Sequence, residues 1–209
     1  MPQRHPAPRR VYLASRSPRR RELLAQIGVA FDLLPFRAGE RADSEVDETP
    51  MPGEAAAEYV HRLAMAKARH GLALTVMRKC LPQPVLAADT ALEVNGEIVG
   101  KPRDARDAAA ILRRLSGHAH RVLTGVAVVS GTRLETALNV SEVFFRPLDE
   151  AEIHRYVESG EPMDKAGAYG IQGHAGLFVE RIVGSYTGIM GLPLCETGCL
   201  LRSFGYAWA

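Results

Sequence analysis

The segment from Ser15 to Arg21 combines two serine hydroxyls with four arginine side chains. Ser17 and Pro18 are typical of the first positions of an α-helix, and the free backbone N–H groups at a helix start attract anions. An arginine side chain can also bind two phosphate oxygens at once. The segment therefore indicates a phosphate-binding site, although an ordinary basic, solvent-exposed helix face would have the same composition.

Asp89 is a candidate catalytic carboxylate. It follows the apolar run 85–88, so we expect it where a buried strand ends, a position from which α/β folds commonly present functional groups to a cleft. A carboxylate there could bind a divalent metal or accept a proton from water, or it could simply cap the next turn. Lys101, in a short loop after Gly100, could bring a positive charge to a phosphate group.

The stretch from Asp164 to Gly173 combines an acid, a base, a phenol and an amide with three glycines. Glycines allow the backbone to approach a ligand closely. The amide of Gln172 could read the edge of a nucleobase, because it carries both a donor and an acceptor. Tyr169 could pack beneath a ring or fill the core. The glycine spacing does not match the dinucleotide-binding fingerprint, since no apolar strand precedes it.

Other catalytic patterns are missing from the sequence. It contains no Walker A motif and no nucleophile elbow, and its histidines do not have metal-ligand spacing. The three cysteines are an odd number in a chain large enough to fold without disulfides. We expect Cys195 and Cys199 to be small buried side chains on a helix.

The elements that position these residues alternate between helix and strand, which predicts an α/β fold with a mixed sheet. Gly71 could divide the second helix into two. Asn95-Gly96 is a strong hairpin signal. The expected strands are 11–14, 29–35, 85–88, 91–94, 97–99, 121–130, 136–145 and 177–183, and the expected helices are 18–27, 53–79, 105–115, 149–158 and 194–204.

Composition narrows the class of protein. The 209 residues are 46% hydrophobic, and 26 Lys+Arg against 24 Asp+Glu leave a net charge of +2. This balance argues against a dedicated binder of nucleic acid or of membrane surfaces. No apolar run approaches the roughly 18–20 residues that span a bilayer, and the N-terminus lacks a signal sequence. We expect a cytoplasmic protein with a disordered leader, residues 1–10, and one domain, residues 11–209.

The separated motifs together resemble those of the Maf family of nucleoside triphosphate pyrophosphatases, over nearly all of the chain from Val11 to Phe204. The resemblance implies a mixed central sheet flanked by helices, with two lobes around a nucleotide cleft, as in Ham1-like folds. The motifs that carry it are Leu13–Arg20, Glu22–Leu24, Ala87–Thr90, Gly100–Asp104, Leu115–Gly117, Asp164–Gly173 and Gly191–Pro193.

The resemblance implies an enzyme, a hydrolase that cleaves a nucleoside triphosphate between its α- and β-phosphates with a divalent cation, Mg²⁺ or Mn²⁺. Asp89 takes the place of the family's catalytic carboxylate and also binds metal. A second acidic metal ligand falls in the segment after Arg37; of Glu40, Asp43 and Glu45 we choose Glu40. Substrate contacts are expected from Ser15, Arg19, Arg20, Lys67, Thr90, Lys101 and Gln172. Three of these, Arg19, Thr90 and Gln172, lie at the positions that determine substrate choice in the family.

The loop from Asp164 to Gly173 looks like the branch of the family that acts on dTTP and UTP, rather than the branch that prefers 7-methyl-GTP. Modified uridine or cytidine triphosphates could be hydrolysed as well, which would make the protein a sanitiser of the nucleotide pool. The family also suggests a homodimer and a link to septum formation. Arg16 departs from the small residue that is usual at its position. The alternative is a non-catalytic nucleotide-binding regulator of cell division.

Overall fold

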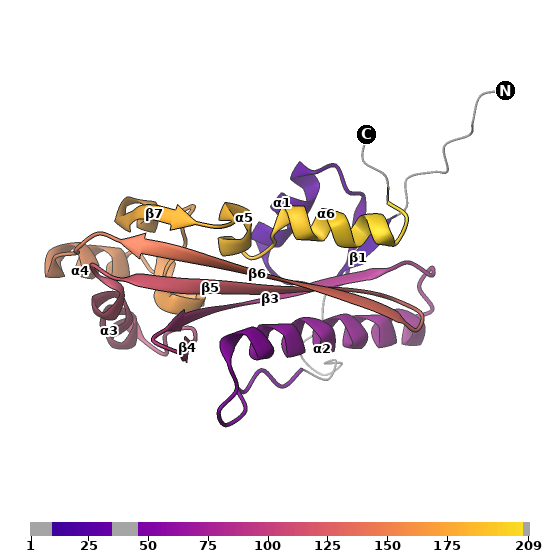
Figure 1. Ribbon diagram of the computed structural model, residues 1–209, viewed down its shortest axis with the longest axis horizontal. Coiled ribbons are helices and arrows are strands. Elements are labelled where there is room, and N and C mark those ends of the chain that lie inside the picture. Colours follow the sequence, from indigo (N-terminus) through magenta and orange to yellow (C-terminus); the bar gives the residue numbers. More distant parts are fainter. Residues whose placement is uncertain (1–9, 35–45, 207–209) are drawn as a thin grey trace.

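The computed structural model describes residues 10–34 and 46–206 (Figure 1). Its core is one mixed sheet of seven strands, in the order β2-β1-β3-β5-β6-β7, with β4 paired to β3. β1 lies parallel to β2 and β3, whereas the remaining pairs are antiparallel. The mixed α/β fold is therefore confirmed. The strands are β1 (Val11–Leu13), β2 (Phe31–Leu33), β3 (Val85–Val94), β4 (Glu97–Val99), β5 (Ala119–Ser130), β6 (Arg133–Phe145) and β7 (Val179–Val183).

Helices cover both faces of this sheet. In Figure 1 the long helix α2 runs along one face, while α1 and α6 lie on the other and α3 and α4 pack at the far end of the long strands. The helices are α1 (Pro18–Gln26), α2 (Ala56–Met77), α3 (Ala105–Leu115), α4 (Glu150–Glu158), α5 (Tyr186–Ile189) and α6 (Leu194–Ser203), with 3₁₀ turns η2 (Glu161–Asp164), η3 (Ala166–Ala168) and η4 (His174–Phe178). None of the helices described is long and apolar enough to cross a membrane.

The predicted two lobes correspond to separate hydrophobic clusters. One cluster joins α3, α4 and β7 to the ends of β3, β5 and β6, and another joins α1 and α6 to β1 and the opposite ends of β3 and β5. The long strands β3 and β5 contribute side chains to both clusters, so they fix the two lobes relative to each other.

Several local signals in the sequence are confirmed. The Ser17 side chain accepts a hydrogen bond from the Arg20 backbone at the start of α1. Asp149 and Glu152 form a reciprocal capping box on α4. Asn95 has a φ of 52° and the residue after it a φ of 81°, the left-handed pair that a two-residue hairpin between β3 and β4 requires.

The sequence left open one long helix or two short ones divided at Gly71, and the structure has one continuous helix, α2. A Cβ on Gly71 would lie 2.9 Å from Val85 Cγ1 and 3.0 Å from Ala14 Cβ, so the missing side chain allows α2 to pack tightly on the sheet. This close packing outweighs the low helix propensity of glycine.

The structure also corrects the predicted end of the strand at Asp89. Pairing with β5 continues without interruption from Val85 to Glu93, and Asp89 lies in the middle of β3. On the other edge of β3, β1 pairs only as far as Leu86 and β4 only from Leu92 onward. Within the described chain, no strand covers the edge between these points. Asp89 therefore reaches a cleft through a gap in the sheet edge rather than from a strand end.

The prediction that Cys195 and Cys199 are buried is wrong, because both are exposed. Helix α6 turns Thr197, Leu200 and Leu201 toward the core. The two cysteines lie four residues apart on the opposite face of the helix, as its 3.6-residue period requires.

Candidate active site

A cavity of about 1100 Å³ opens at the gap in the edge of β3. Its walls come from the loop between β1 and α1, the segment before α2, α2 itself, the end of β4, the 164–172 loop and the turn after α5. The predicted site residues that the structure describes all line it: Ser15, Arg19, Arg20, Lys67, Asp89, Thr90, Lys101 and Gln172. The structure thus brings together residues that lie far apart in the sequence.

Two predictions fall wholly or largely outside the described residues. Glu40, predicted as a metal ligand, lies in the segment 35–45, and nine of the ten residues of the predicted leader, 1–10, are also not described. Arg16 is described, is exposed and lines the cavity.

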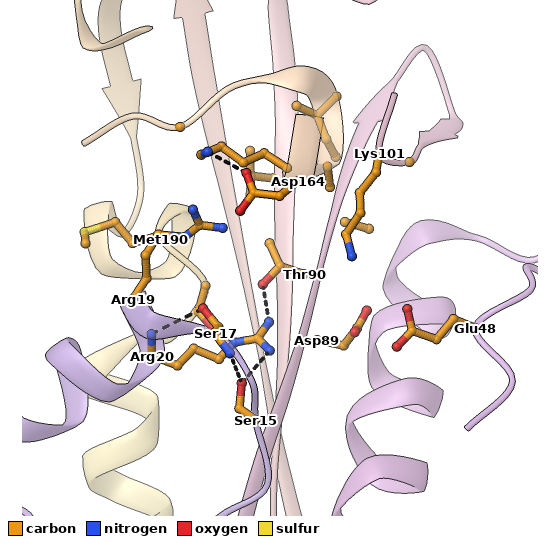
Figure 2. A pocket seen from close by; sticks show the side chains of 18 of the residues that line it. Ser15, Ser17, Arg19, Arg20, Glu48, Asp89, Thr90, Lys101, Asp164 and Met190 are labelled. Carbon is orange, nitrogen blue, oxygen red and sulfur yellow. Dashed lines mark hydrogen bonds and ion pairs between the residues drawn. The ribbon is translucent and has the colours of Figure 1, made fainter. Parts of the chain in front are cut away.

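A group of two carboxylates and one ammonium lies at the base of the cavity. Lys67 Nζ is 2.5 Å from Asp89 Oδ1 and 2.6 Å from Glu48 Oε1. The side chains of Lys67 and Asp89 are 15% and 10% exposed, whereas that of Glu48 is 54% exposed. Figure 2 shows Asp89 and Glu48 side by side, with Lys101 extending toward them from above. Lys67, Asp89 and Glu48 therefore hold one another in place at the gap in the sheet.

Glu48 lines the cavity, but the sequence did not single it out among the carboxylates of residues 40–48. Burial raises the pKa of its carboxyl, but the hydrogen bond and charge of Lys67, with the charges of Lys101 and Arg20, outweigh burial and leave the pKa below its usual value. Nearby, burial together with the charges of Asp89 and Glu48 raises the pKa of Tyr59 to about 12. The only sequence signal for Glu48 was its place in an acidic segment ahead of a long helix.

Arg20 connects the loop between β1 and α1 to the rest of the site. Its Nε donates to the Gly191 carbonyl at 2.8 Å, Nη1 donates to Ser15 Oγ at 3.4 Å, and Nη2 donates to Thr90 Oγ1 at 3.1 Å. Burial lowers the pKa of this guanidinium, and the charge of Asp89 opposes that shift. Arginine keeps its proton even so. Arg20 is therefore a fixed positive charge that joins the start of α1, β3 and the turn after α5.

Thr90 belongs to a chain of hydrogen-bonded hydroxyl groups, and the donor and acceptor of each bond can be assigned. Thr124 is fully buried, and its Oγ1 donates to the Gly188 carbonyl at 2.8 Å. Thr90 Oγ1 lies 2.9 Å from Thr124 Oγ1. Since a hydroxyl has one hydrogen and Thr124 gives its own to Gly188, Thr90 must be the donor to Thr124. Thr90 therefore has no hydrogen left for a ligand and can only accept.

The loop after η2 forms the opposite wall. Lys165 Nζ donates to Asp164 Oδ1 at 2.6 Å and to the Glu161 carbonyl at 2.5 Å, so its charge is already used within the loop. Tyr169 is 6% exposed, and its hydroxyl is 2.8 Å from His120 Nε2. Burial raises the pKa of Tyr169 and lowers the pKa of His120 to about 4. Tyr169 therefore fills the core, the second of its two predicted roles, while its edge reaches the cavity.

The fold resembles that of a solved structure, which gives the first indication of the class of protein. The solved structure of the Staphylococcus aureus Ham1 protein superimposes with a TM-score of 0.50 over 94% of this chain and 97% of that chain, at 14% sequence identity. At this identity the likeness shows a shared fold and nothing more. The chain also matches the family described as Maf-like protein over residues 10–204. It therefore belongs to the Maf family.

Relatives with high identity cover nearly the whole chain. A protein of Dechloromonas aromatica is 65% identical over 94% of this chain and 98% of its own length. Proteins of Aromatoleum aromaticum and Cupriavidus metallidurans are 63% and 55% identical, over 96% and 93% of this chain and 98% and 96% of their own lengths. All three relatives carry the name dTTP/UTP pyrophosphatase.

Proposed function

We propose that this protein hydrolyses dTTP and UTP to the nucleoside monophosphate and pyrophosphate. The observation that carries the proposal is the cavity itself, where Asp89 and Glu48 meet the cationic side chains of Lys67 and Lys101 beside a helix start. The names of the relatives support the choice of substrate. Their high identity over nearly the full chain makes the same reaction the simplest expectation here.

The cationic side of the cavity suits the triphosphate. The start of α1 offers backbone N–H groups, and the loop before it offers the Ser15 hydroxyl. Arg19 and Arg20 on α1 and Lys101 after β4 add positive charge. Anions bind well where a helix start and arginine side chains meet. A triphosphate bound there would extend from α1 toward Lys101 across the face of Asp89.

The residues also suit a divalent cation. Mg²⁺ prefers oxygen ligands and is commonly held by one or two carboxylates together with substrate phosphates. Asp89 and Glu48 supply two such carboxylates, which Lys67 already draws together. Within residues 10–34 and 46–206 there is no cluster of three or more acidic, histidine or cysteine residues, so phosphate oxygens would complete the shell. The cation would neutralise charge that develops on the phosphates.

Asp89 would act as the general base. Lys67 holds one oxygen of its carboxylate, Oδ1, which fixes the orientation of the group toward the cavity. A water molecule that loses its proton to this carboxylate would attack the α-phosphorus. The new P–O bond forms as the bond from the α-phosphorus to the bridging oxygen breaks, and pyrophosphate leaves. Arg20 and Lys101 would stabilise the charge on the leaving group.

Gln172, Thr90 and Arg19 would set the choice of base. Gln172 is exposed at the rim of the cavity, where its amide could bind the edge of uracil or thymine. The direction of the hydroxyl chain limits Thr90 to accepting a hydrogen bond, so its main effect would be to orient Arg20. A site that reads only this edge would also accept uridine triphosphates modified elsewhere on the ring, whereas cytidine triphosphates, which present a different edge, would be poorer substrates.

The test is pyrophosphate release from a panel of canonical and modified nucleoside triphosphates with Mg²⁺ or Mn²⁺. The panel compares the wild type with Asp89→Asn and with Glu180→Gln, which removes an exposed carboxylate far from the proposed chemistry. We expect dTTP and UTP to be the best substrates, Glu180→Gln to be unchanged, and Asp89→Asn to lose at least about 100-fold in kcat.

A folded wild type that binds nucleotide but releases no pyrophosphate would contradict the proposal. In that case a non-catalytic nucleotide-binding regulator of cell division would explain the site better. The two functions also differ in cells, because an effect on septum formation that survives Asp89→Asn would not depend on hydrolysis.

A further inference from the structure

Glu161 is the centre of a half-buried hydrogen-bond cluster behind the wall of the cavity that carries Gln172. Its side chain is 18% exposed. Oε1 accepts a hydrogen bond from the Tyr156 hydroxyl at 3.0 Å, and Oε2 accepts one from the His174 backbone N–H at 3.1 Å. Oε2 also lies 2.8 Å from His174 Nδ1. The carboxylate therefore joins α4 to the start of η4.

The Tyr156 hydroxyl extends this cluster to a second point of the loop. Tyr156 is 4% exposed, and its oxygen accepts a hydrogen bond from the Gly170 backbone N–H at 3.3 Å. The chain of hydrogen bonds thus runs from Gly170 through Tyr156 to Glu161, where it meets the bond from His174. The two anchored backbone groups lie on either side of residues 171–173, and Gln172 is at the centre of that segment.

The glycines of this loop fit the same arrangement. A Cβ on Gly173 would lie 2.1 Å from Glu161 Oε1, so the backbone crosses directly over the carboxylate and has no room for a side chain. A Cβ on Gly170 would lie 2.8 Å from Lys165 Cε, and Lys165 in turn donates to the Glu161 carbonyl. Loop and carboxylate are therefore packed against each other as one unit.

The protonation of the cluster is consistent with these bonds. Burial raises the pKa of Glu161, but hydrogen bonds from His174 and Tyr156 and the charge of Lys165 outweigh it, so the pKa is lower than usual. Burial and the charge of Glu161 raise the pKa of Tyr156. Glu161 is thus an anion, and Tyr156 keeps the hydrogen that it donates.

We propose that Glu161 is a positioning residue for substrate choice: through Tyr156 and His174 it fixes the backbone on both sides of Gln172, and so sets which nucleobase the site accepts. The inference rests on the proposed function, in which Gln172 contacts the base. Glu161 itself is behind the loop and is not among the residues that line the cavity. Its effect must therefore pass through the loop.

The test compares the kinetics of UTP and CTP, whose bases differ at the edge that an amide would read. Glu161→Gln replaces one carboxylate oxygen by an NH₂ group, which cannot accept a hydrogen bond, so the side chain can no longer accept the bond from Tyr156 and the bond from His174 at the same time. We expect KM for UTP to rise about tenfold with kcat within about threefold, because an interaction with the bound base is lost rather than one with the reacting phosphate. The preference for UTP over CTP should fall by a similar factor.

Two further variants keep the outcome interpretable. Tyr156→Phe removes only the bridging hydroxyl and should shift the preference in the same direction. Glu158→Gln is the matched control, since Glu158 is 71% exposed and its recorded ion-pair contact is with His154 at 3.8 Å. Its kinetics should equal those of the wild type.

A double-mutant cycle of Glu161→Gln with Gln172→Ala separates a positioning role of Glu161 from a purely structural one. If Glu161 acts through Gln172, adding Glu161→Gln to Gln172→Ala should change the preference for UTP little further. A wild type that prefers UTP, with the same preference in Glu161→Gln and Tyr156→Phe, would overturn the positioning role alone. A wild type that hydrolyses no pyrimidine triphosphate would overturn the proposed function and this inference with it.

Discussion

The contact between α2 and the sheet at Gly125 can be tested by Gly125→Ala, which adds a single methyl group. Gly125 is paired with Asp89 across β3 and β5, and α2 crosses directly over it. A Cβ on Gly125 would lie 2.5 Å from the Val60 carbonyl oxygen, 2.8 Å from the Val60 carbonyl carbon and 3.1 Å from the His61 nitrogen. These are backbone atoms of a helix, so none of them can rotate away. In Gly125→Ala the helix has to move.

The size of the effect follows from these distances. Ordinary Cβ contacts begin at 3.4 Å, so α2 must shift by roughly 1 Å from a fully packed position. Overpacking of a core costs about 1–3 kcal/mol, and the rigid backbone here points to the upper end, about 3 kcal/mol. For a chain of this size that loss lowers Tm by about 6–12 °C. Because α2 also carries Lys67, kcat/KM should fall as well.

The assay is urea unfolding followed by far-UV circular dichroism, with the slope m checked for change. Gly100→Ala is the control, because its Cβ would meet nothing within 4 Å and its backbone is not in the left-handed region. It should remain within about 0.5 kcal/mol of the wild type. If Gly125→Ala were equally close to the wild type, the direct backbone contact between α2 and β5 would be refuted.

Three further predictions follow from the site. Lys67→Met should lower kcat by about 100-fold or more, because Asp89 loses the group that orients it; steady-state kinetics that match the wild type would contradict this. Thr124→Val should cost about 1–2 kcal/mol in urea unfolding and raise KM for UTP, whereas Thr124→Ser, which keeps the hydroxyl, should do neither. His120 has its pKa lowered to about 4 by burial, so the neutral ring contributes stability that is complete above pH 6.5 and is lost as pH falls from 6.5 to 4. Over that window the free energy of unfolding should fall by about 3 kcal/mol, and His120→Gln should flatten the profile.

Short-range features of this fold could be predicted from the sequence because their causes are local. Ser17 caps α1 within three residues of chain, and Asn95 starts a turn that its own backbone preference selects. The motifs with the candidate site residues were likewise visible, since each lies within a short run. Their convergence in one cavity then follows from the order of the strands.

The features that could not be predicted depend on partners far away in the sequence. The extent of β3 through Asp89 is set by its pairing with β5, more than thirty residues later. Gly71 stays helical because it packs closely on Val85 of β3 and on Ala14, just after β1. Glu48 is brought to Asp89 by Lys67 on α2, and nothing in the acidic segment itself distinguishes it from its neighbours. Cys195 is exposed because the packing of α6, not its own hydrophobicity, decides which face is buried.

In the proposed reaction, water attacks the α-phosphorus of a pyrimidine nucleoside triphosphate at Asp89. Hydrolysis of UTP in water enriched in ¹⁸O, with mass spectrometry of the products, tests it most directly. The structure predicts UMP and pyrophosphate in equal amounts, the label in UMP, and no product above background from Asp89→Asn. Formation of UDP and labelled phosphate, or label in pyrophosphate instead of UMP, would contradict the claim.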